Sequence, residues 1–371
     1  MPGRVVLAAN SSWNIVNFRA GLIRALKAAG YEPVVVAPIE PAAERRMAEL
    51  DVERVVVDLQ RSGLNPLADF ALLREYRRIL KQLQPVAYLG FTIKPNIYGC
   101  LAAGDLGIAS IANVSGLGTV FITRGPLLAL VTRLYRRALR KAGVVFFQNP
   151  DDRDEFVGRR LVRPDQARLL PGSGVDLERF APVPLPQGPV TFLFIGRLLG
   201  DKGVREFVGA ARQLKGAGMR FQLLGPLDEG NRSGISRREL DEWMAEGVVD
   251  YLGETDDVRP SISQATAVVL PSYREGLPRS LLEAAAMGRP LVATDVPGCR
   301  EVVEDGVNGF RCAPADATSL AAAISSLAEV SEGQREAMGA ASRHMVQQRF
   351  GENVVIAAYL DALGKLTGAR S

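Results

Sequence analysis

Residues Ala265–Met287 read ATAVVLPSYREGLPRSLLEAAAM, and they predict a strand, a loop and a helix in direct succession. The first six residues, Ala265–Leu270, form an apolar run typical of a buried parallel strand. Pro278 suits the first position of the helix, because its φ is fixed and it has no amide hydrogen to leave unpaired. The helical pattern ends near Met287.

Two carboxylates lie eight residues apart in this segment, Glu275 in the loop and Glu283 in the helix. The start of a helix presents free amide hydrogens and about half a positive charge. Gly276, beside that end, allows an anion to come close. Such a site suits a ligand that is anionic in one part and rich in hydroxyls elsewhere. A sugar nucleotide is a ligand of this kind.

The same succession of strand and helix repeats along the chain, and it predicts parallel sheets covered by helices on both faces. In the first half we expect strands at 4–9, 33–37, 53–58, 86–90, 109–113 and 143–148, and helices at 17–29, 67–83, 95–104, 126–141 and 151–158. In the second half we expect strands at 190–196, 220–224, 266–270 and 290–293, and helices at 202–215, 236–245 and 278–287.

A link rich in proline, Ala181–Pro189, separates the two series. The expected fold class is therefore α/β, with two Rossmann-like, doubly wound domains facing across a cleft. Their expected bounds are 1–180 and 188–352, and the helical segment 353–371 is expected to pack back on the first domain. Ligands of open α/β sheets bind at the carboxyl ends of the strands.

Composition favours a reduced, cytoplasmic protein. The 371 residues are 47% apolar and 23% charged, and no apolar stretch has the length of a transmembrane helix. The N-terminus lacks the long apolar region of a signal peptide. The three cysteines, Cys100, Cys299 and Cys312, are far apart, which argues against a zinc site or a disulfide framework.

The net charge of +4 is unevenly distributed. Residues 1–180 hold 25 basic and 17 acidic side chains, whereas the remainder holds 20 and 24. The basic surplus of the first half is compatible with an anionic membrane surface, with a nucleic acid, or with chance surface composition.

A second charged loop, GRLLGDKG at Gly196–Gly203, follows the strand VTFLFIG. Arg197 is expected to point from the strand end into the cleft. Asp201 is a good helix cap, which would place Lys202 in the first helical turn. Two cations at the positive end of a helix suit a diphosphate. The alternative is that both are solvated surface charges.

Together with GSGVDLERF (residues 172–180) and SYREGLPRSLLEAAAMGRPLVATDVPGCREVVEDGVNGF (residues 272–310), this loop resembles the group-1 or family-4 glycosyltransferases. Those are retaining enzymes of the GT-B fold that use nucleotide sugars. The resemblance is dense in the C-terminal half of the chain and loose in the N-terminal half.

The resemblance implies roles for individual residues. Arg197 and Lys202 would hold the donor diphosphate and stabilise its charge as it departs, and Glu275 would lie by the donor sugar. Glu283 would accept hydrogen bonds from the ribose hydroxyls. The implied donor-binding set is Gly196, Gly276, Leu277, Glu283 and Gly298. Gly298 would lie close enough to the donor to need a small residue, or it is simply a left-handed turn.

The transition state of such a transfer resembles an oxocarbenium ion, and charge builds on the leaving diphosphate. The family is described by same-face attack assisted by the leaving phosphate, so neither carboxylate need be a nucleophile. No DxD pair lies in a suitable loop. We therefore expect no metal and no other cofactor.

On the acceptor side, many family members have a histidine near the donor sugar, and this chain has none available there. The segment Gly90–Asn96 follows the comparable strand, so Lys94 or Thr92 is a candidate substitute. Ser115 and Gly116, in the stretch Asn113–Arg124, are further candidates for the acceptor side.

A basic amphipathic segment follows, with six basic residues and no acidic one between 119 and 141. One side carries Leu127, Leu130, Val131, Leu134, Tyr135 and Ala138, and the other carries Arg133, Arg136, Arg137, Arg140 and Lys141. Such a helix can lie on an anionic bilayer. Alternatively, it packs its apolar face on the sheet of a Rossmann-like domain and leaves its arginines in solvent.

The segments FTIKPNIYG and NVSGLGTVF resemble a subgroup that acts on polyprenyl-diphosphate-linked sugars in bacterial glycan assembly. The implied partners are a nucleotide sugar, with UDP the commonest carrier, a lipid-linked saccharide acceptor, and the inner face of the cytoplasmic membrane. The alternatives are a nucleotide-sugar epimerase or a non-catalytic binding protein of the same fold. No nucleic acid is expected, because the basic run lacks interleaved aromatics and any reader motif.

Overall fold

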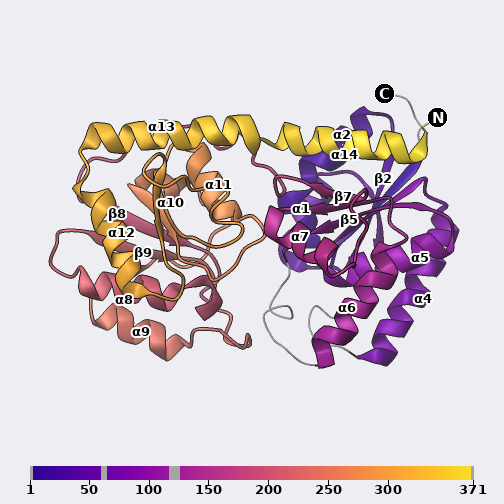
Figure 1. Cartoon of the computed structure of the whole chain (residues 1–371), viewed down its shortest axis with the longest axis horizontal. Coiled ribbons are helices and arrows are strands. Elements are labelled where there is room, and N and C mark those ends of the chain that lie inside the picture. The colour runs from indigo at the N-terminus through magenta and orange to yellow at the C-terminus, as the bar shows by residue number, and fades with distance from the viewer. Residues whose placement is uncertain (1–2, 60–64, 117–125, 369–371) are drawn as a thin grey trace. The chain divides into compact units, whose positions relative to one another are not determined.

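A computed structural model describes residues 3–59, 65–116 and 126–368 (Figure 1). The chain divides into two compact units. Unit 1 comprises Met1–Ser173 together with Glu352–Ser371, and unit 2 comprises Gly174–Gly351.

Unit 1 contains a seven-stranded, fully parallel sheet in the order β3-β2-β1-β4-β5-β6-β7. The strands are β1 (Arg4–Ala8), β2 (Glu32–Ala37), β3 (Glu53–Val56), β4 (Ala87–Phe91), β5 (Ala109–Val114), β6 (Val144–Phe147) and β7 (Ala167–Leu169). The strand order reverses at β1, which lies between β2 and β4. The carboxyl ends of β1 and β4 therefore flank the switch point, where open α/β sheets bind their ligands.

Both faces of this sheet are buried, because successive side chains of a strand point to opposite faces. Val5 and Leu7 of β1 join one core cluster, and Val6 and Ala8 join another. The first cluster is covered by α1 (Ser12–Phe18), α2 (Ala20–Ala28), α3 (Glu44–Ala48) and α14 (Glu352–Thr367). The second is covered by α4 (Pro66–Leu83), α5 (Cys100–Asp105), α6 (Pro126–Leu139) and α7 (Pro150–Gly158).

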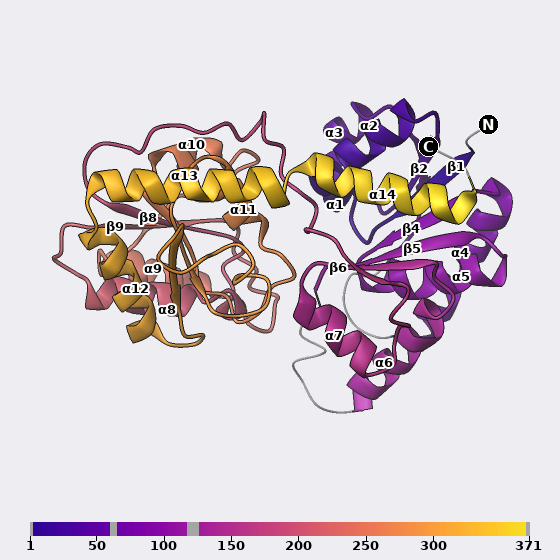
Figure 2. The ribbon, with the colours of Figure 1, turned by 45° about the horizontal axis from the view of Figure 1, so that its top comes forward.

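The last helix, α14, is part of the core of unit 1. It packs against α2 and β5, and both views show it beside α2 (Figures 1 and 2). Tyr359 is 1% exposed, and its ring makes edge contacts with Phe91 and Phe146 at centroid distances of 6.1 and 5.1 Å. Its hydroxyl accepts a hydrogen bond from Asn113 Nδ2 at 2.5 Å.

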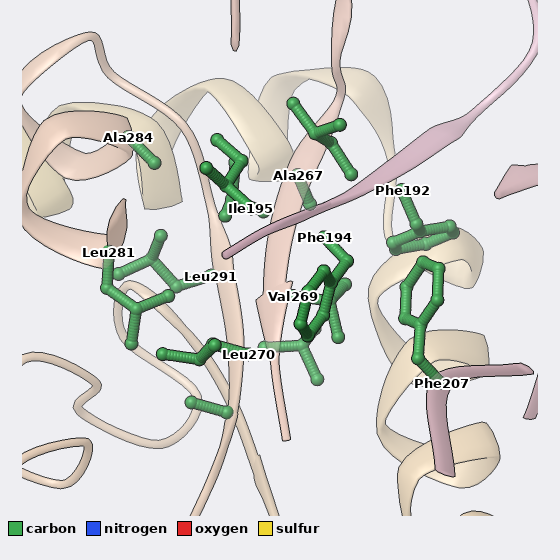
Figure 3. Close-up of a cluster of buried hydrophobic side chains, with 14 of the residues drawn as sticks. Phe192, Phe194, Ile195, Phe207, Ala267, Val269, Leu270, Leu281, Ala284 and Leu291 are labelled. Carbon is green, nitrogen blue, oxygen red and sulfur yellow. The ribbon is translucent and has the colours of Figure 1, made fainter. Parts of the chain in front are cut away.

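Unit 2 contains a six-stranded parallel sheet in the order β10-β9-β8-β11-β12-β13. The strands are β8 (Thr191–Ile195), β9 (Arg220–Leu224), β10 (Asp250–Tyr251), β11 (Ala267–Leu270), β12 (Leu291–Thr294) and β13 (Gly309–Cys312). The helices are α8 (Val204–Gln213), α9 (Arg237–Ala245), α10 (Arg259–Gln264), α11 (Arg279–Ala286), α12 (Ala317–Glu329) and α13 (Glu332–Arg349). Figure 3 shows part of the core, where Phe194 of β8 meets Phe207 of α8 at 5.9 Å between ring centroids.

The segment that links the two sheets belongs to unit 2. Arg289 is fully buried and donates to the carbonyls of Pro184 at 2.8 Å and Ile262 at 3.0 Å. Arg343 of α13 donates to the carbonyls of Phe180 and Leu177 at 2.9 and 3.2 Å. Two arginines thus hold this proline-rich segment against unit 2, and the division falls at Ser173 rather than near 180.

The predicted doubly wound architecture is confirmed, and the differences are local. The helix expected at 17–29 is two helices, because the backbone breaks at Arg19, with φ −130° and ψ 0°. The helix expected at 95–104 begins with a wide turn over Pro95–Gly99 and continues as α5. The sequence patterns missed the short elements α1, α3, α10, β7, β10 and β13, and also α12.

Candidate functional site

The loops at the carboxyl ends of β8 and β11 flank the switch point of the sheet in unit 2. They carry three residues predicted to be catalytic, Arg197, Lys202 and Glu275, of which Lys202 and Glu275 are in contact. The two loops are joined by backbone, since Tyr273 N donates to Asp201 O at 3.0 Å. The placement agrees with the general rule for ligand sites in such sheets.

Lys202 and Glu275 form an ion pair across these loops. Lys202 Nζ lies 2.5 Å from Glu275 Oε1, and their side chains are 28% and 11% exposed. The close approach depends on Gly203, whose φ is +74° and where a Cβ atom would lie 2.0 Å from the carbonyl oxygen of Pro271. A side chain at this position would therefore separate the two loops.

The predicted helix cap at Asp201 is wrong. Gly200–Lys202 form a single tight turn, Gly203 takes the cap position, and α8 begins at Val204. Lys202 thus lies before the helix and not in its first turn. Its ammonium reaches Glu275 from a loop position.

Arg197 leaves the end of β8 and is 55% exposed. Its Nη1 lies 2.9 Å from Asp228 Oδ2, in the loop after β9. The two loops approach closely because both contain glycine: a Cβ atom on Gly225 would lie 2.1 Å from Gly196 O. An exposed pair of this kind contributes roughly 0–1 kcal/mol to stability, so Arg197 can exchange partners at little cost.

Glu283 lies in α11, one turn beyond Arg279. Arg279 Nε lies 2.6 Å from Glu283 Oε1, and the two side chains are 22% and 13% exposed. Burial raises the pKa of the Glu283 carboxyl above its ordinary value of 4.5, although Arg279 acts in the opposite direction. Pro278 takes the cap position rather than the first helical position, since α11 begins at Arg279.

Gly298, in the loop after β12, touches the same site. Its φ is +87°, and a Cβ atom there would lie 2.6 Å from Glu275 O. Glu275 N donates to Pro297 O at 3.1 Å, which holds the two loops together. The left-handed turn is therefore present, and the neighbour that excludes a side chain at Gly298 is the Glu275 backbone. Closeness of Gly298 to a donor stays a prediction. Gly276 is buried, and Leu277 packs half-buried against the core.

In unit 1, Thr92 and Lys94 follow β4 at the switch point. Thr92 has a φ of +71°, which is strained for a β-branched residue, and its Oγ1 accepts from Asn10 N at 3.3 Å. Lys94 Nζ lies 2.9 Å from Asp69 Oδ1 of α4, with side chains 11% and 8% exposed. The Lys94 ammonium is thus held inside the unit.

Ser115 and Gly116 follow β5. Ser115 is exposed, and Gly116 has a φ of +133°. The rest of this predicted acceptor stretch, residues 117–124, lies outside the described residues.

The basic helix α6 packs its apolar side into unit 1, with Val131, Tyr135 and Ala138 at most 4% exposed. These three side chains are therefore not open to a bilayer. Lys141 Nζ lies 2.5 Å from Asp105 Oδ1, and Arg136 Nη2 donates to Arg159 O. Arg133, Arg137 and Arg140 are exposed, as is Leu130 at 47%.

Sequence reasoning missed the partners of the charged residues. Arg279 lies four residues before Glu283, so helical spacing could have revealed that pair. Asp69 and Asp228 carry no local signal, because each meets its cation only through the tertiary fold.

Residues 3–59, 65–116 and 126–368 are those that the structure describes. They contain no group of three or more His, Cys, Asp or Glu side chains placed to hold a metal ion. None of their helices combines the length and apolar character that crossing a bilayer requires.

Two family descriptions cover most of the chain. Residues 15–172 match "Glycosyl transferase 4-like domain", and residues 189–329 match "Glycosyl transferases group 1". The chain belongs to the group 1 glycosyltransferases. It is an enzyme that transfers glycosyl groups, as the resemblance implied.

Among its relatives, the N,N'-diacetylbacillosaminyl-diphospho-undecaprenol alpha-1,3-N-acetylgalactosaminyltransferase of Campylobacter jejuni is 29% identical, over 96% of this chain and 97% of its own. Sucrose-phosphate synthase from Thermosynechococcus elongatus has a similar structure, with a TM-score of 0.82 at 20% identity over 99% of this chain and 100% of its own. HepE of Anabaena, in complex with UDP and glucose, matches with a TM-score of 0.80 at 18% identity over 97% and 99%. This glycosyltransferase has the predicted GT-B fold.

Proposed function

We propose that this glycosyltransferase moves a hexose or an N-acetylhexosamine from a UDP-linked sugar to a lipid-linked saccharide, with retention of anomeric configuration. The setting would be bacterial surface-glycan or glycoprotein-glycan assembly. The observation that carries the acceptor is the end-to-end similarity to the C. jejuni enzyme, whose name specifies a diphospho-undecaprenol substrate.

The donor end of the proposal rests on unit 2. Arg197 and Lys202 lie in the loop at the carboxyl end of β8. Each forms an ion pair with a carboxylate that a diphosphate could replace or join. Preorganised cations stabilise charge on a departing diphosphate without reorganisation at the moment of reaction. Glu283 is the candidate for the ribose hydroxyls, and UDP occupies the related HepE structure.

Retention follows from same-face attack assisted by the leaving phosphate. Glu275 is suited to orienting groups rather than to nucleophilic attack, because its carboxylate is bound to Lys202 at 2.5 Å. Arg197 and Lys202 would stabilise the charge of the departing diphosphate in place of a metal ion. The proposed reaction therefore needs neither a metal nor another cofactor.

The proposed location is the inner face of the cytoplasmic membrane. Arg133 and Arg137 of α6 and Arg140 just after it are exposed, and each basic residue near an anionic surface contributes about 1 kcal/mol of attraction. Binding would be mainly electrostatic, since Val131, Tyr135 and Ala138 of α6 are inside unit 1.

The test incubates the enzyme with radiolabelled nucleotide sugars and bacterial membrane lipids, with and without excess chelator. We expect label from one UDP-sugar in the organic phase, undiminished by chelator, and a product whose anomeric linkage matches the donor. If label enters only a soluble acceptor, the proposal of a lipid-linked acceptor is wrong. Conversion of the donor sugar without acceptor would indicate an epimerase, and affinity without turnover would indicate a binding protein.

A further inference from the structure

Trp13 is the most exposed aromatic side chain near the switch point of unit 1. Its ring is 46% exposed at the start of α1, whereas Ile15 and Val16 on the same helix are 0% and 2% exposed. The chain has two tryptophans, and the other, Trp243, is 4% exposed in unit 2. Single exposed apolar residues are common on protein surfaces, so exposure alone assigns nothing. The surroundings of Trp13, in contrast, indicate a role in binding a ligand.

The position of Trp13 is that of a ligand-binding residue. It follows β1, the strand at which the sheet order of unit 1 reverses. The hydrogen bond from Asn10 N to Thr92 Oγ1 connects this loop with the loop after β4. Ligands of open α/β sheets bind between the loops at this point.

The ring is presented on a rigid support. Trp13 N donates to Glu40 Oε2 at 2.7 Å, and the same oxygen accepts from Ser11 Oγ at 2.6 Å. The indole meets the ring of Phe18 edge-on, at 5.3 Å between centroids and an interplanar angle of 88°. Contacts that fix a side chain before binding reduce the entropy lost when the ligand arrives.

Amide side chains lie on the same side of α1, away from its buried residues. Asn17 Nδ2 donates to Trp13 O at 2.9 Å, and its Oδ1 accepts from Arg46. Asn14 Oδ1 is buried and accepts no hydrogen bond within the described part of the chain. Asn14 and Asn17 thus place amide side chains beside the exposed indole.

The occupant that fits is a neutral sugar ring. One face of a pyranose is formed by C–H groups and its rim carries hydroxyls, which matches an aromatic face bordered by amides. Glu40 and Arg46 both lie beside this patch, and each is already engaged in hydrogen bonds within the unit, so neither is set aside for a charged ligand.

We propose that the indole of Trp13 stacks on a pyranose ring of the acceptor saccharide. The proposal rests on the proposed function, in which the acceptor is a lipid-linked saccharide.

Kinetics give the first test. The probe is an N-acetylhexosamine carried on a short prenyl diphosphate, with the donor found in the radiolabel panel. Trp13→Ala is expected to raise the acceptor KM about tenfold with the donor KM unchanged, and Trp13→Phe to restore most of the affinity. Trp243→Phe is the control and should change neither. An unchanged acceptor KM in Trp13→Ala, or a rise in the donor KM instead, overturns the proposal.

Fluorescence gives a test that needs no turnover. In a Trp243→Phe background Trp13 is the only tryptophan, and the probe should protect it from acrylamide quenching. Vesicles of anionic phospholipid without saccharide should leave its emission unchanged, and a blue shift with those vesicles would assign the ring to lipid and overturn the proposal. If no lipid-linked saccharide is ever glycosylated, the proposed function fails. If acceptor is glycosylated while Trp13 stays open to acrylamide, only the stacking proposal fails.

Discussion

The charged residues at the switch points of the two units differ in burial. In unit 2 the side chains of Arg197 and Asp228 are 55% and 34% exposed. In unit 1 the side chains of Lys94 and Asp69 are 11% and 8% exposed. An exposed pair can release its cation to a ligand, whereas a buried pair is committed to the fold, because separating it strands a charge. Unit 2 thus has an exposed cation that a ligand can recruit, whereas the cation after β4 in unit 1 is committed to Asp69.

The largest expected effect tests the buried pair. Lys94→Ala should lower the free energy of unfolding by about 3–5 kcal/mol, because Asp69 would remain buried and unpaired. Denaturant unfolding measures the change. The double variant Lys94→Met with Asp69→Leu should recover most of the stability. Full stability of Lys94→Ala with loss of turnover would instead show that Lys94 replaces the family's histidine, and the contrast between the units would fail.

The second prediction concerns the exposed pair. Arg197→Ala should reduce kcat about 10²–10³-fold, because a cation aimed at the leaving diphosphate acts mainly in the transition state. Stability should change by less than about 1 kcal/mol. Arg212→Ala is the matched control. Arg212, on α8, forms a similarly exposed pair with Glu246, the residue after α9, and the two side chains are 47% and 41% exposed. Equal kcat values for Arg197→Ala and Arg212→Ala would show that Arg197 does not take part in catalysis.

Gly298→Ala probes how tightly the loops of unit 2 are joined. The new methyl group meets Glu275 O at 2.6 Å and also requires a positive φ, so we expect a loss of about 1–3 kcal/mol and a raised donor KM. Gly306→Ala shares the positive φ, at +74°, but its methyl group meets nothing within 4 Å. If both variants lose the same stability and keep the donor KM, contact with Glu275 is unimportant.

The smallest effect is the pH dependence due to Glu283. Its raised pKa means that the native state holds the proton more tightly than the unfolded chain does. The free energy of unfolding therefore falls as pH rises from about 4.5 through the raised pKa. Glu283→Gln should gain stability relative to the parent over that interval, measured by urea unfolding at several pH values. Glu246→Gln should show the opposite sign, because Arg212 lowers the pKa of Glu246.

How well the sequence predicted each unit depends on the distance over which its contacts form. In unit 2 the candidate residues lie in strand–loop–helix segments, so local patterns predicted the loops that carry Arg197, Lys202 and Glu275. Gly298 was proposed from the family resemblance. In unit 1 the decisive contacts join distant positions, such as Asn113 with Tyr359, 246 residues apart. No local pattern encodes such a contact. Similarly, the helical periodicity of α6 predicted an apolar side, but only the packing shows that α5 and the turn Pro95–Gly99 cover part of it.

The helix α14 has a consequence for how the chain is made. Val355, Tyr359, Ala362 and Leu363 fill part of the core of unit 1, yet they are synthesised after all of unit 2. On the ribosome, unit 2 has its full sequence before unit 1 has its last helix, so the unit that begins first is completed last. A stop codon near residue 351 would leave unit 2 whole and open the hydrophobic core of unit 1. The final 20 residues thus decide whether the proposed acceptor half of the enzyme folds.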